Sequence, residues 1–351
     1  MNDTIVSPRQ KHILNIIQSS NGLLREQIQT EVDKVYQISK PTIIRDLNSL
    51  LDKKLIKSQG SARATKYYPL TQNPLLRKFD INRYFLDEPD QRIKAQKSFD
   101  YGMLDSLYDL FTSNELQTLT SIAKSFKAET QKLNSDILKR ELERFVIELS
   151  WKSSKIEGNT YSLLETESLI KDQKQAPGKT KKETIMILNH KNTFDQILNN
   201  IHDFKNLKIS TINQLHNTLI KDLDISTGIR NQAVGITGTV YQPLDNQHQV
   251  SEVFSKTIDI INEKISPFDK ALIASFMIPY IQPYSDGNKR TTRMLTNAIL
   301  LGYDLYPLSY RSVDEDNFKK ALILFYEQGS IIEIKKIFIE QVVFSNQTYF
   351  K

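Results

Sequence analysis

The sequence predicts a mostly α-helical protein of about two domains, and three observations support this fold class. The chain has 351 residues, enough to bury at least one sizeable core. It has only 11 glycines and 11 prolines, about half of the usual share of roughly 12%, so long helices are favoured over glycine-rich loops. Hydrophobic residues make up 39% and charged residues 25%, which is ordinary for a globular protein and argues against global disorder.

The composition also excludes several classes of site. No cysteine is present, so disulfides, thiolate zinc sites and cysteine nucleophiles are ruled out. No two of the five histidines stand at helical ligand spacing, so a histidine-rich metal site is not expected. No apolar run reaches the ~18 residues of a membrane span, and the start, MNDTIVSPRQK, has no apolar signal core. We therefore expect no membrane partner and a cytoplasmic location.

Positive charge is concentrated in the first fifth of the chain. Residues 1–70 hold 11 basic and six acidic side chains, which leaves +5 of the net charge of +6 in this region. A small domain with most of the positive charge indicates an anionic partner, with nucleic acid first. The alternative is that these charges form an ordinary solvated surface.

The same region has the pattern of three short helices followed by two short strands. The helices are expected to begin at Ser7-Pro8, to cover 23–32 and to begin at Ser39, and the strands to cover 55–58 and 65–68. Residues 1–70 therefore predict a winged helix-turn-helix domain. The stretch SKPTIIRDLNSLLDKKLIK resembles the recognition helix and following strand of bacterial winged-helix repressors.

That resemblance implies that the third helix enters the major groove of DNA. The helix has Ile44, Leu47 and Leu51 on one side and Thr42, Arg45, Asp46 and Ser49 on the other. The expected contacts are Lys40 and Lys66 with phosphates, Thr42, Arg45 and Ser49 with base edges, and Arg63 at the wing tip with the backbone or the minor groove. Asp46 can pair with its neighbour Arg45 and weaken base readout. Alternatively, the domain docks a protein or forms a dimer.

Beyond residue 70 the chain changes character. Residues 71–112 mix prolines, acidic residues and scattered aromatics, and we interpret them as a partly ordered connecting segment. A second, helical domain is expected over 113–351, with one long helix over 137–151.

The most informative segment of the second domain is IQPYSDGNKRTTR, residues 281–293. It lies between two apolar helices, so it is a tight loop that leads into a helix N-terminus. Backbone N–H groups and the helix dipole favour an anion there. Gly287 allows close backbone approach, Asn288 can fix the loop, and Arg290 and Arg293 add positive charge on one helix face. Asp286 is an oxygen ligand suited to Mg²⁺. The segment predicts a polyphosphate and magnesium site.

This segment resembles the motif H-x-F-x-D/E-G-N-G-R-x-x-R of the Fic family. In that family the histidine takes a proton from a target hydroxyl, which usually receives AMP from ATP. The resemblance implies ATP and Mg²⁺ as ligands and a Fic-type helical bundle with a short β-hairpin flap over about 145–345. It makes Asp286 the metal ligand, Gly287 and Asn288 the anion nest, Arg290 the phosphate clamp and Arg293 the second arginine.

Three positions depart from that motif: Gln282 replaces the histidine, Tyr284 replaces the phenylalanine and Lys289 replaces the second glycine. A lysine at the position of Lys289 also occurs in the toxin branch of the family, some members of which transfer phosphate instead of AMP. The amide of Gln282 has no titratable group near neutral pH and cannot act as a general base. Loss of such a base typically costs about 10²–10⁴ in rate. Nucleotide binding is expected to remain.

A further segment, SSKIEG from Ser153 to Gly158, matches the inhibitory pattern S/T-x-x-x-E-G/N of the family. The resemblance implies that Glu157 pairs with Arg293 and blocks the productive position of the γ-phosphate. Such a charge pair would compete with phosphate for the arginine. The alternative is that Glu157-Gly158 only ends a helix.

Residues 234–243 alternate in polarity around a glycine turn and predict a β-hairpin. In Fic proteins a flap at this position pairs with the backbone of a protein target by strand addition, whereas the alternative is a hairpin without a partner. His216 is expected to be a satisfied, partly buried residue. His248, just after the segment, is the one histidine to consider as a substitute base.

Three functions stay open at this point. The favoured one is a nucleotide-responsive, DNA-binding regulator with impaired catalysis, because Gln282 replaces the base. The second is an autoinhibited transferase that moves AMP or phosphate to a protein hydroxyl. The third is a non-catalytic scaffold for protein docking or for homodimer formation. Whether the protein is an enzyme is therefore not decided by its sequence.

Overall fold

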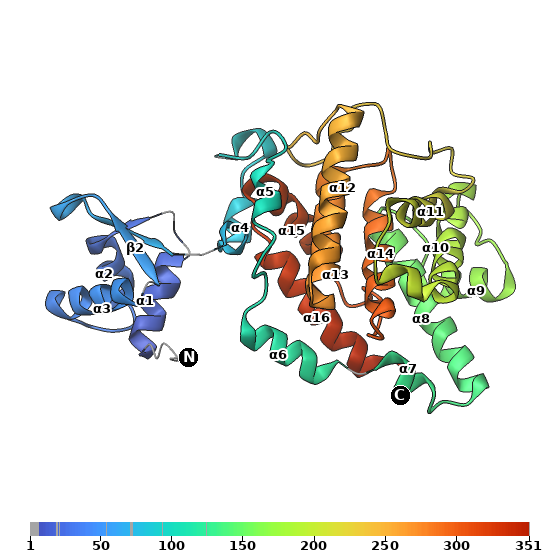
Figure 1. The fold of residues 1–351 in the computed structure, drawn as a ribbon, viewed down its shortest axis with the longest axis horizontal. Helices are drawn as coiled ribbons and strands as arrows, with labels where there is room; N and C mark the ends of the chain where they lie inside the picture. The colour runs from blue at the N-terminus through green and yellow to red at the C-terminus, as the bar shows by residue number, and fades with distance from the viewer. Residues whose placement is uncertain are drawn as a thin grey trace. The chain divides into compact units, whose positions relative to one another are not determined.

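The computed structural model describes residues 7–350, apart from positions 19, 21, 54, 71, 72, 93 and 124 (Figure 1). The chain divides into two compact units, Met1–Arg92 with Gly329–Ile332 and Ile93–Gln328 with Glu333–Lys351. The expected connecting segment, 71–112, is shared between them, and domain boundaries at 70 and 112 stay predictions. Helices dominate the described residues beside one small sheet, which confirms the mostly α fold class.

The first unit contains the helices and antiparallel sheet of a winged helix. Its elements are α1 (Pro8–Gln18), β1 (Leu23–Leu24), α2 (Arg25–Asp33), α3 (Lys40–Asp52), β2 (Ile56–Gln59), η1 (Ala62–Ala64) and β3 (Lys66–Pro69), followed by η2 (Pro74–Leu76), α4 (Ile81–Tyr84) and η3 (Pro89–Gln91). The sheet has the order β1-β3-β2, with Gln59 opposite Lys66. Helix α3 begins after an extended Ser39, and Pro41 stands in its first turn, where a proline costs no hydrogen bond.

Helix α3 differs from expectation in what it buries. Eight aliphatic side chains form the core of this unit: Ile13, Ile17, Ile28, Val32, Ile43, Leu47, Leu50 and Ile56. The expected core residues Ile44 and Leu51 are only partly buried, because the helix is turned toward Ile43 and Leu50.

Asp46 does not pair with Arg45, the partner that the sequence offered next to it. Asp46 is buried and accepts a hydrogen bond from Arg9 of α1, with 2.6 Å between Arg9 Nε and Asp46 Oδ2. The positively charged partner of Asp46 is therefore Arg9 of α1, a helix packed against α3, and not the neighbouring Arg45. The side chain of Arg45 is exposed.

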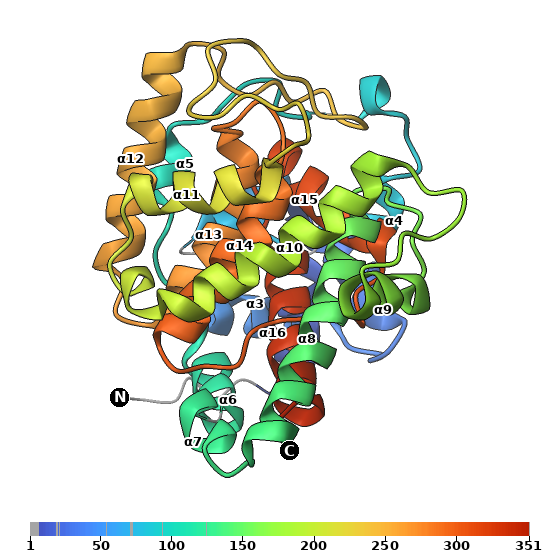
Figure 2. The ribbon, with the colours of Figure 1, turned by 90° about the vertical axis from the view of Figure 1, so that its right-hand side faces the viewer.

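The second unit is a helical bundle around two almost fully buried helices, α13 (Pro267–Ile281) and α14 (Asn288–Gly302). The other elements are α5 (Gly102–Asp105), α6 (Ser113–Ile122), α7 (Phe126–Thr130), α8 (Ser135–Ile156), α9 (Leu163–Asp172), α10 (Lys181–Asn199), η4 (Ile201–Phe204), α11 (Ile209–Ile220), α12 (Gln247–Glu263), α15 (Glu315–Gln328) and α16 (Ile332–Thr348). Helix α14 contacts α8, α10, α11 and α13, which surround it in Figure 2. Helix α13 is mostly apolar, and nearly all of its residues are buried, which suits an interior position.

The expected β-hairpin over 234–243 is absent, since the described residues there contain no strand. The backbone groups at both ends of the segment are bound elsewhere. The buried guanidinium of Arg230 donates to the carbonyl oxygens of Gln232 and Leu244, and Gln242 N donates to the carbonyl oxygen of Lys97 over 3.0 Å. A hairpin needs its two arms to pair with each other. These contacts leave an irregular loop instead.

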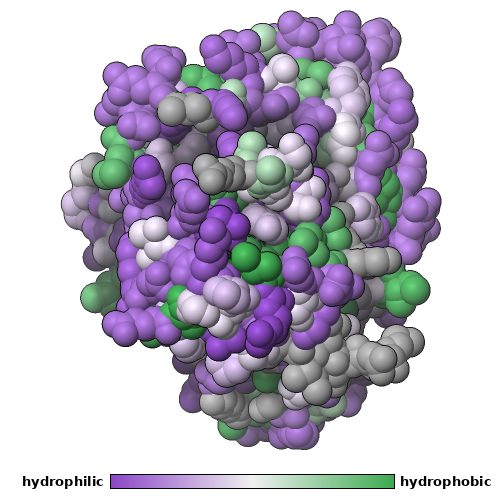
Figure 3. Space-filling model, turned by 90° about the vertical axis from the view of Figure 1, so that its left-hand side faces the viewer, coloured by the Kyte–Doolittle hydropathy of each residue, from purple (hydrophilic) through white to green (hydrophobic). Residues whose placement is uncertain are grey.

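Among the described helices, none is both long enough and apolar enough to cross a membrane. On the face drawn in Figure 3, hydrophilic side chains predominate and hydrophobic ones lie scattered in small groups. Single exposed apolar side chains, such as Leu86 and Ile265, are normal on a protein surface and indicate no site by themselves.

Candidate functional site

The loop between α13 and α14 is shaped by two residues with left-handed backbone. Gln282 ends α13 with a φ of 51°, and Gly287 caps α14 with a φ of 81°. A Cβ atom on Gly287 would also lie 3.1 Å from Cγ2 of Ile220 at the end of α11. Glycine therefore suits this position, both for its conformation and for the close approach of α11.

Asn288 and Gln282 hold the loop together through their amides. Asn288 Oδ1 accepts a hydrogen bond from Tyr284 N over 2.9 Å, and Asn288 Nδ2 donates to Gln282 Oε1 over 2.7 Å. Gln282 Nε2 donates to the carbonyl oxygen of Pro279 over 2.8 Å. Gln282 thus uses both ends of its amide to join the last turn of α13 to the first residue of α14. Its role in this structure is to hold the loop.

Two buried arginines follow on α14, and both keep donors without partners. Arg290 is 3% exposed and Arg293 is 1% exposed. Within the described residues, Nη1 of each side chain makes no hydrogen bond. Burial lowers the pKa of Arg290 from its ordinary value, although the side chain stays a cation. Buried, unsatisfied guanidinium donors beside a helix N-terminus suit a phosphate group.

Glu157 lies directly after α8 and reaches the same cations. Its Oε1 is 2.9 Å from Nη2 of Arg293, and its Oε2 is 3.8 Å from Nζ of Lys289. Burial alone would raise the pKa of Glu157, but Arg293 and Lys289 together hold that pKa below its ordinary value. The carboxylate is therefore ionised at neutral pH and occupies donors that a phosphate could use.

These groups meet at one cavity of about 260 Å³. It is lined by Glu157, Met186, Val234, Gly235, Ile236, Thr237, Gln282, Ser285, Asp286, Gly287, Asn288, Lys289 and Arg290. The residues predicted for the nucleotide site that line the cavity come from one loop, 282–290, and the structure adds Glu157 and residues 234–237 from distant segments. Arg293, Ser153 and Gly158 do not line the cavity, and Arg293 reaches it through its contact with Glu157.

Asp286 suits a metal that a nucleotide brings with it. Its side chain is 70% exposed, with Oδ2 3.8 Å from Nη2 of Arg290. In the described part of the chain, no three carboxylate or histidine side chains form a group that could hold a metal alone. Mg²⁺ commonly binds one carboxylate together with substrate phosphates. The donor set therefore fits Mg²⁺ with a nucleotide and not an isolated metal site.

His216 is tied to the loop, a contact that the sequence did not reveal. Its ring stacks on Tyr284, with 3.7 Å between the ring centroids, and its Nε2 donates to the carbonyl oxygen of Asp286 over 3.0 Å. Burial lowers the pKa of His216, which keeps the ring neutral. His248 is the second residue of α12, and it is not among the residues that line the cavity. No local signal indicated His216, because α11 and the loop are far apart in sequence.

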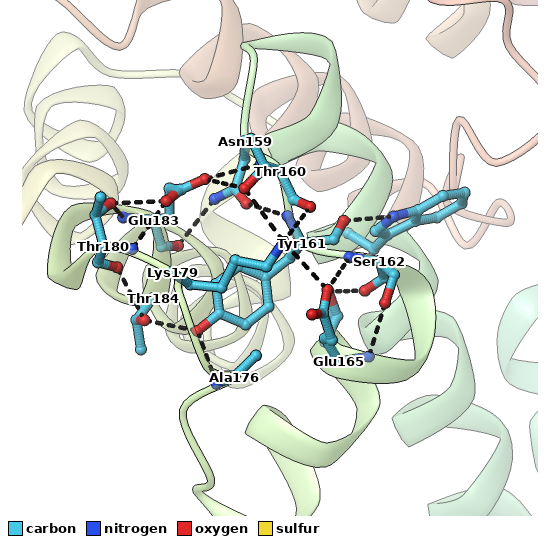
Figure 4. A network of polar contacts seen from close by, with 12 residues as sticks. Asn159, Thr160, Tyr161, Ser162, Glu165, Ala176, Lys179, Thr180, Glu183 and Thr184 are labelled. Carbon is cyan, nitrogen blue, oxygen red and sulfur yellow. Dashed lines mark hydrogen bonds and ion pairs between the residues drawn. The ribbon is translucent and has the colours of Figure 1, made fainter.

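Glu183, in the first turn of α10, ties that helix to the turn after Glu157 (Figure 4). Its Oε1 accepts hydrogen bonds from N and Oγ1 of Thr160 over 2.9 and 2.6 Å. Its Oε2 accepts from N and Oγ1 of Thr180 over 2.9 and 2.8 Å. Lys179 Nζ donates to the carbonyl oxygen of Thr160 over 2.7 Å. Every polar group of Thr160 is thus bound, which restrains the turn that carries Glu157.

We expect Glu183→Gln to lower the free energy of unfolding at neutral pH by about 1–2 kcal/mol, because an amide cannot accept all four hydrogen bonds. The hydrogen bonds from Thr160 and Thr180 lower the pKa of Glu183 from 4.5 to about 2. The folded value lies below the unfolded one, so this stabilisation is present above the unfolded value and is lost as pH falls toward the folded one. The free energies of unfolding of the two proteins, measured with urea, should therefore converge as the pH falls from 4.5 to about 2. A constant difference would contradict the prediction.

The residues predicted to contact DNA lie on α3, on strand β3 and, for Arg63, on η1. A shallow hollow of about 430 Å³ on α3 is lined by Pro41, Ile44, Arg45, Asn48, Ser49, Asp52 and Lys53. Lys40 and Lys66 are exposed, whereas the hydroxyl of Thr42 is 3.0 Å from that of Ser39 at the helix start. Asn48, which the sequence pattern did not single out, shares the exposed face of Arg45. The side chain of Arg63 lies outside the described part of the structure.

Both units match known families. Residues 206–300 match the Fic/DOC family, and this range contains the loop of Gln282 to Arg293. Residues 6–83 match the penicillinase repressor family, and this range contains α1, α2, α3 and the three-stranded sheet of the first unit.

Relatives in sequence carry the name protein adenylyltransferase. The chain is 26% identical to fic-1 of Caenorhabditis elegans over 154 residues, which cover 42% of this chain and 30% of that protein. It is 30% identical to Fic of Aedes aegypti over 173 residues, which cover 47% of this chain and 34% of that protein. The chain thus spans about a third of the length of these relatives.

Solved structures agree in fold. A Fic domain containing signaling protein from Bacteroides thetaiotaomicron superposes with a TM-score of 0.56 at 21% identity, covering 66% of this chain and 94% of that chain. Fic-1 from C. elegans superposes with a TM-score of 0.56 at 20% identity, covering 70% of this chain and 80% of that chain. At these identities the likeness shows the fold alone.

Proposed function

Since the chain carries a Fic/DOC domain at 206–300 and a winged helix of the penicillinase repressor family at 6–83, we propose that it is a DNA-binding regulator whose second unit binds ATP with Mg²⁺. The observation that carries the nucleotide proposal is the pair of buried arginines with unpartnered Nη1 donors, Arg290 and Arg293. They follow Gly287 at the N-terminus of α14, where backbone N–H groups and the helix dipole also favour a phosphate. Glu157 contacts Arg293 in this site, with 2.9 Å between Oε1 and Nη2.

Binding of ATP with Mg²⁺ is tested by calorimetry on the full chain. We expect measurable binding that Arg290→Ala abolishes, because it removes a buried cation from the cavity. Arg140→Ala is the matched control, since Arg140 is exposed on α8 and does not line the cavity. Equal affinities for all three proteins would contradict a nucleotide site at this loop.

The regulatory part of the proposal is tested by linkage. If ATP and DNA binding are coupled, ATP changes the affinity for DNA, and DNA changes the affinity for ATP by the same factor. Binding to a pool of random-sequence duplexes is therefore compared with and without ATP and Mg²⁺. Identical DNA affinities with the nucleotide site saturated would remove the nucleotide response from the proposal.

DNA binding by the first unit should depend steeply on salt. Each phosphate contact contributes a slope of about −0.9 to log K against log [salt]. We expect Lys40→Ala to reduce that slope by about one and to weaken binding to all sequences equally. Lys34→Ala is the control, because Lys34 forms a surface ion pair with Glu31 at 2.8 Å and is not among the predicted DNA contacts. A flat salt dependence would favour a protein partner for this unit.

A second candidate is an autoinhibited transferase, which the presence of Asp286, Asn288 and both arginines in one site favours. In such a reaction a hydroxyl oxygen bonds to the α-phosphorus of ATP, the bond to the β-phosphate bridging oxygen breaks, pyrophosphate leaves and the hydroxyl proton goes to a base. Gln282 cannot take that proton, since its amide is neutral and bound at both ends. We therefore place binding before catalysis.

A further inference from the structure

Arg293 is held by a buried chain of hydrogen bonds that the nucleotide proposal has not used. Its Nε donates to Oγ of Ser153 over 2.8 Å, and its Nη2 donates to the carbonyl oxygen of Ser153 over 2.9 Å. Oγ of Ser153 lies 2.8 Å from Nε2 of His190 on α10. His190 and Ser153 have no exposed surface, and Arg293 has 1%. No solvent-exposed group takes part.

The carbonyl oxygen of Met186, the last group in this series of hydrogen bonds, determines which atom donates in each of them. Nδ1 of His190 lies 2.7 Å from the carbonyl oxygen of Met186, so Nδ1 must carry the hydrogen. Burial lowers the pKa of His190 to about 3, so the ring is neutral and Nε2 has a free lone pair. Nε2 therefore accepts from the hydroxyl of Ser153, and that hydroxyl oxygen accepts from Nε of Arg293. The carbonyl oxygen of Met186 thus orients the ring, and the ring orients the hydroxyl.

Ser153 and Glu157 bind different parts of the Arg293 guanidinium. Glu157 contacts only Nη2, at 2.9 Å, whereas Ser153 binds both Nε and Nη2. If Glu157 withdraws, the two contacts with Ser153 remain and still define the plane of the group. Nη1, which is buried and has no partner among the described residues, and the freed side of Nη2 are then the donors left for an anion.

We propose that His190, acting through Ser153, is a positioning residue that holds Arg293 ready for a phosphate group. The inference rests on the proposed nucleotide site and adds to it the device that orients its most buried cation. A guanidinium that is held before binding loses less conformational freedom when the anion arrives. His190 therefore contributes to nucleotide affinity without touching the nucleotide.

The first test compares ATP–Mg²⁺ affinities in the Glu157→Gly background. We expect a further His190→Phe change to weaken ATP binding about tenfold, which corresponds roughly to the loss of one charge-assisted hydrogen bond. With His190→Gln the affinity should stay within about threefold, because the glutamine amide oxygen can accept the hydrogen bond from Ser153. With Arg293→Ala also present, His190→Phe should change the affinity by less than about twofold, since the effect passes through Arg293. Equal losses with and without Arg293, or no loss in either, would overturn the proposal.

Asn189→Leu is the control for loss of a buried polar group on α10. Asn189 donates to the carbonyl oxygens of Leu219 and Lys221 and is not part of the chain to Arg293. It should destabilise the protein while leaving ATP affinity unchanged. A loss of affinity as large as that of His190→Phe would show that the effect is only structural.

The second test needs no nucleotide. The Nε–H signal of Arg293, identified by its loss in Arg293→Lys, should exchange slowly with solvent in the natural chain. We expect exchange to accelerate at least about tenfold in Ser153→Ala and His190→Phe and to stay slow in Glu157→Gly. Unchanged exchange in His190→Phe would overturn the positioning role. If no variant binds ATP, the proposed function fails, and this measurement alone decides the role of His190.

Discussion

Replacing Glu157 by glycine should tighten the binding of ATP with Mg²⁺ by about 10- to 100-fold. Hydrogen bonds between charged groups are worth about 1.5–3 kcal/mol, and each 1.4 kcal/mol is a factor of ten in affinity. The contact between Glu157 and Arg293 is of this kind, because the Arg293 side chain is 2% exposed and that of Glu157 19%. A phosphate that takes Arg293 must first displace the carboxylate. The glycine variant removes that competition before ATP arrives.

Two variants separate the effect of charge from other effects. Glu157→Gln keeps the volume of the side chain and removes its charge, so most of the gain should already appear there. Glu263→Gly makes the same substitution at the last residue of α12, where Glu263 is exposed and does not line the cavity. Its ATP affinity should equal that of the natural chain. Calorimetry measures all four proteins, and an unchanged affinity in a folded Glu157→Gly protein would end the inhibitory role of Glu157.

Replacing Gln282 by histidine in the Glu157→Gly chain should raise AMP transfer by about 10²–10⁴, the range typical of a general base. An imidazole is partly neutral near pH 7 and can take the proton of an attacking hydroxyl, which the amide cannot. The measurement is self-labelling of the chain with α-labelled ATP and Mg²⁺. The natural chain and Glu157→Gly alone should stay near background.

The substitution also has a structural cost that must be measured. Gln282 joins Pro279 of α13 to Asn288 of α14 through two hydrogen bonds, and an imidazole whose acceptor nitrogen faces the attacking hydroxyl loses the one from Asn288. A thermal unfolding scan should therefore show a lower Tm for Gln282→His. Gln282→Asn is the control, because it also loosens the loop but supplies no base, and it should not label. Labelling by the natural chain would show that the transferase candidate is correct and that another group accepts the proton.

The two predictions together separate binding from chemistry. Tighter binding without any transfer in Gln282→His would support a nucleotide-binding regulator whose catalytic geometry is lost. Transfer that appears only when both changes are combined would show that the site keeps its arrangement for catalysis and lacks a base. Neither result depends on how the two units of the chain are arranged, because every residue concerned belongs to the second unit.

Local sequence patterns were sufficient for the helix starts and for the loop. Ser39 with Pro41 begins α3, and Gly287 caps α14, because caps and left-handed positions depend on the residues at the site itself. The contact of Glu157 with Arg293 was expected from a family pattern, and the two side chains lie 2.9 Å apart. Its inhibitory role stays a prediction. The identity of residue 282 as glutamine indicated only that it is not a base. It did not predict the hydrogen bonds that its side chain makes to Pro279 and Asn288.

What the sequence by itself determined is therefore the local structure: a winged helix at the start and a turn capped by Gly287 before α14. Tertiary structure alone decided which distant groups meet. It paired Asp46 with Arg9 instead of Arg45, kept 234–243 from forming a hairpin, and placed His190 next to Ser153. The reason is physical. Caps and turns are satisfied by neighbours in the chain, whereas a buried polar group takes its partner from whichever element packs against it.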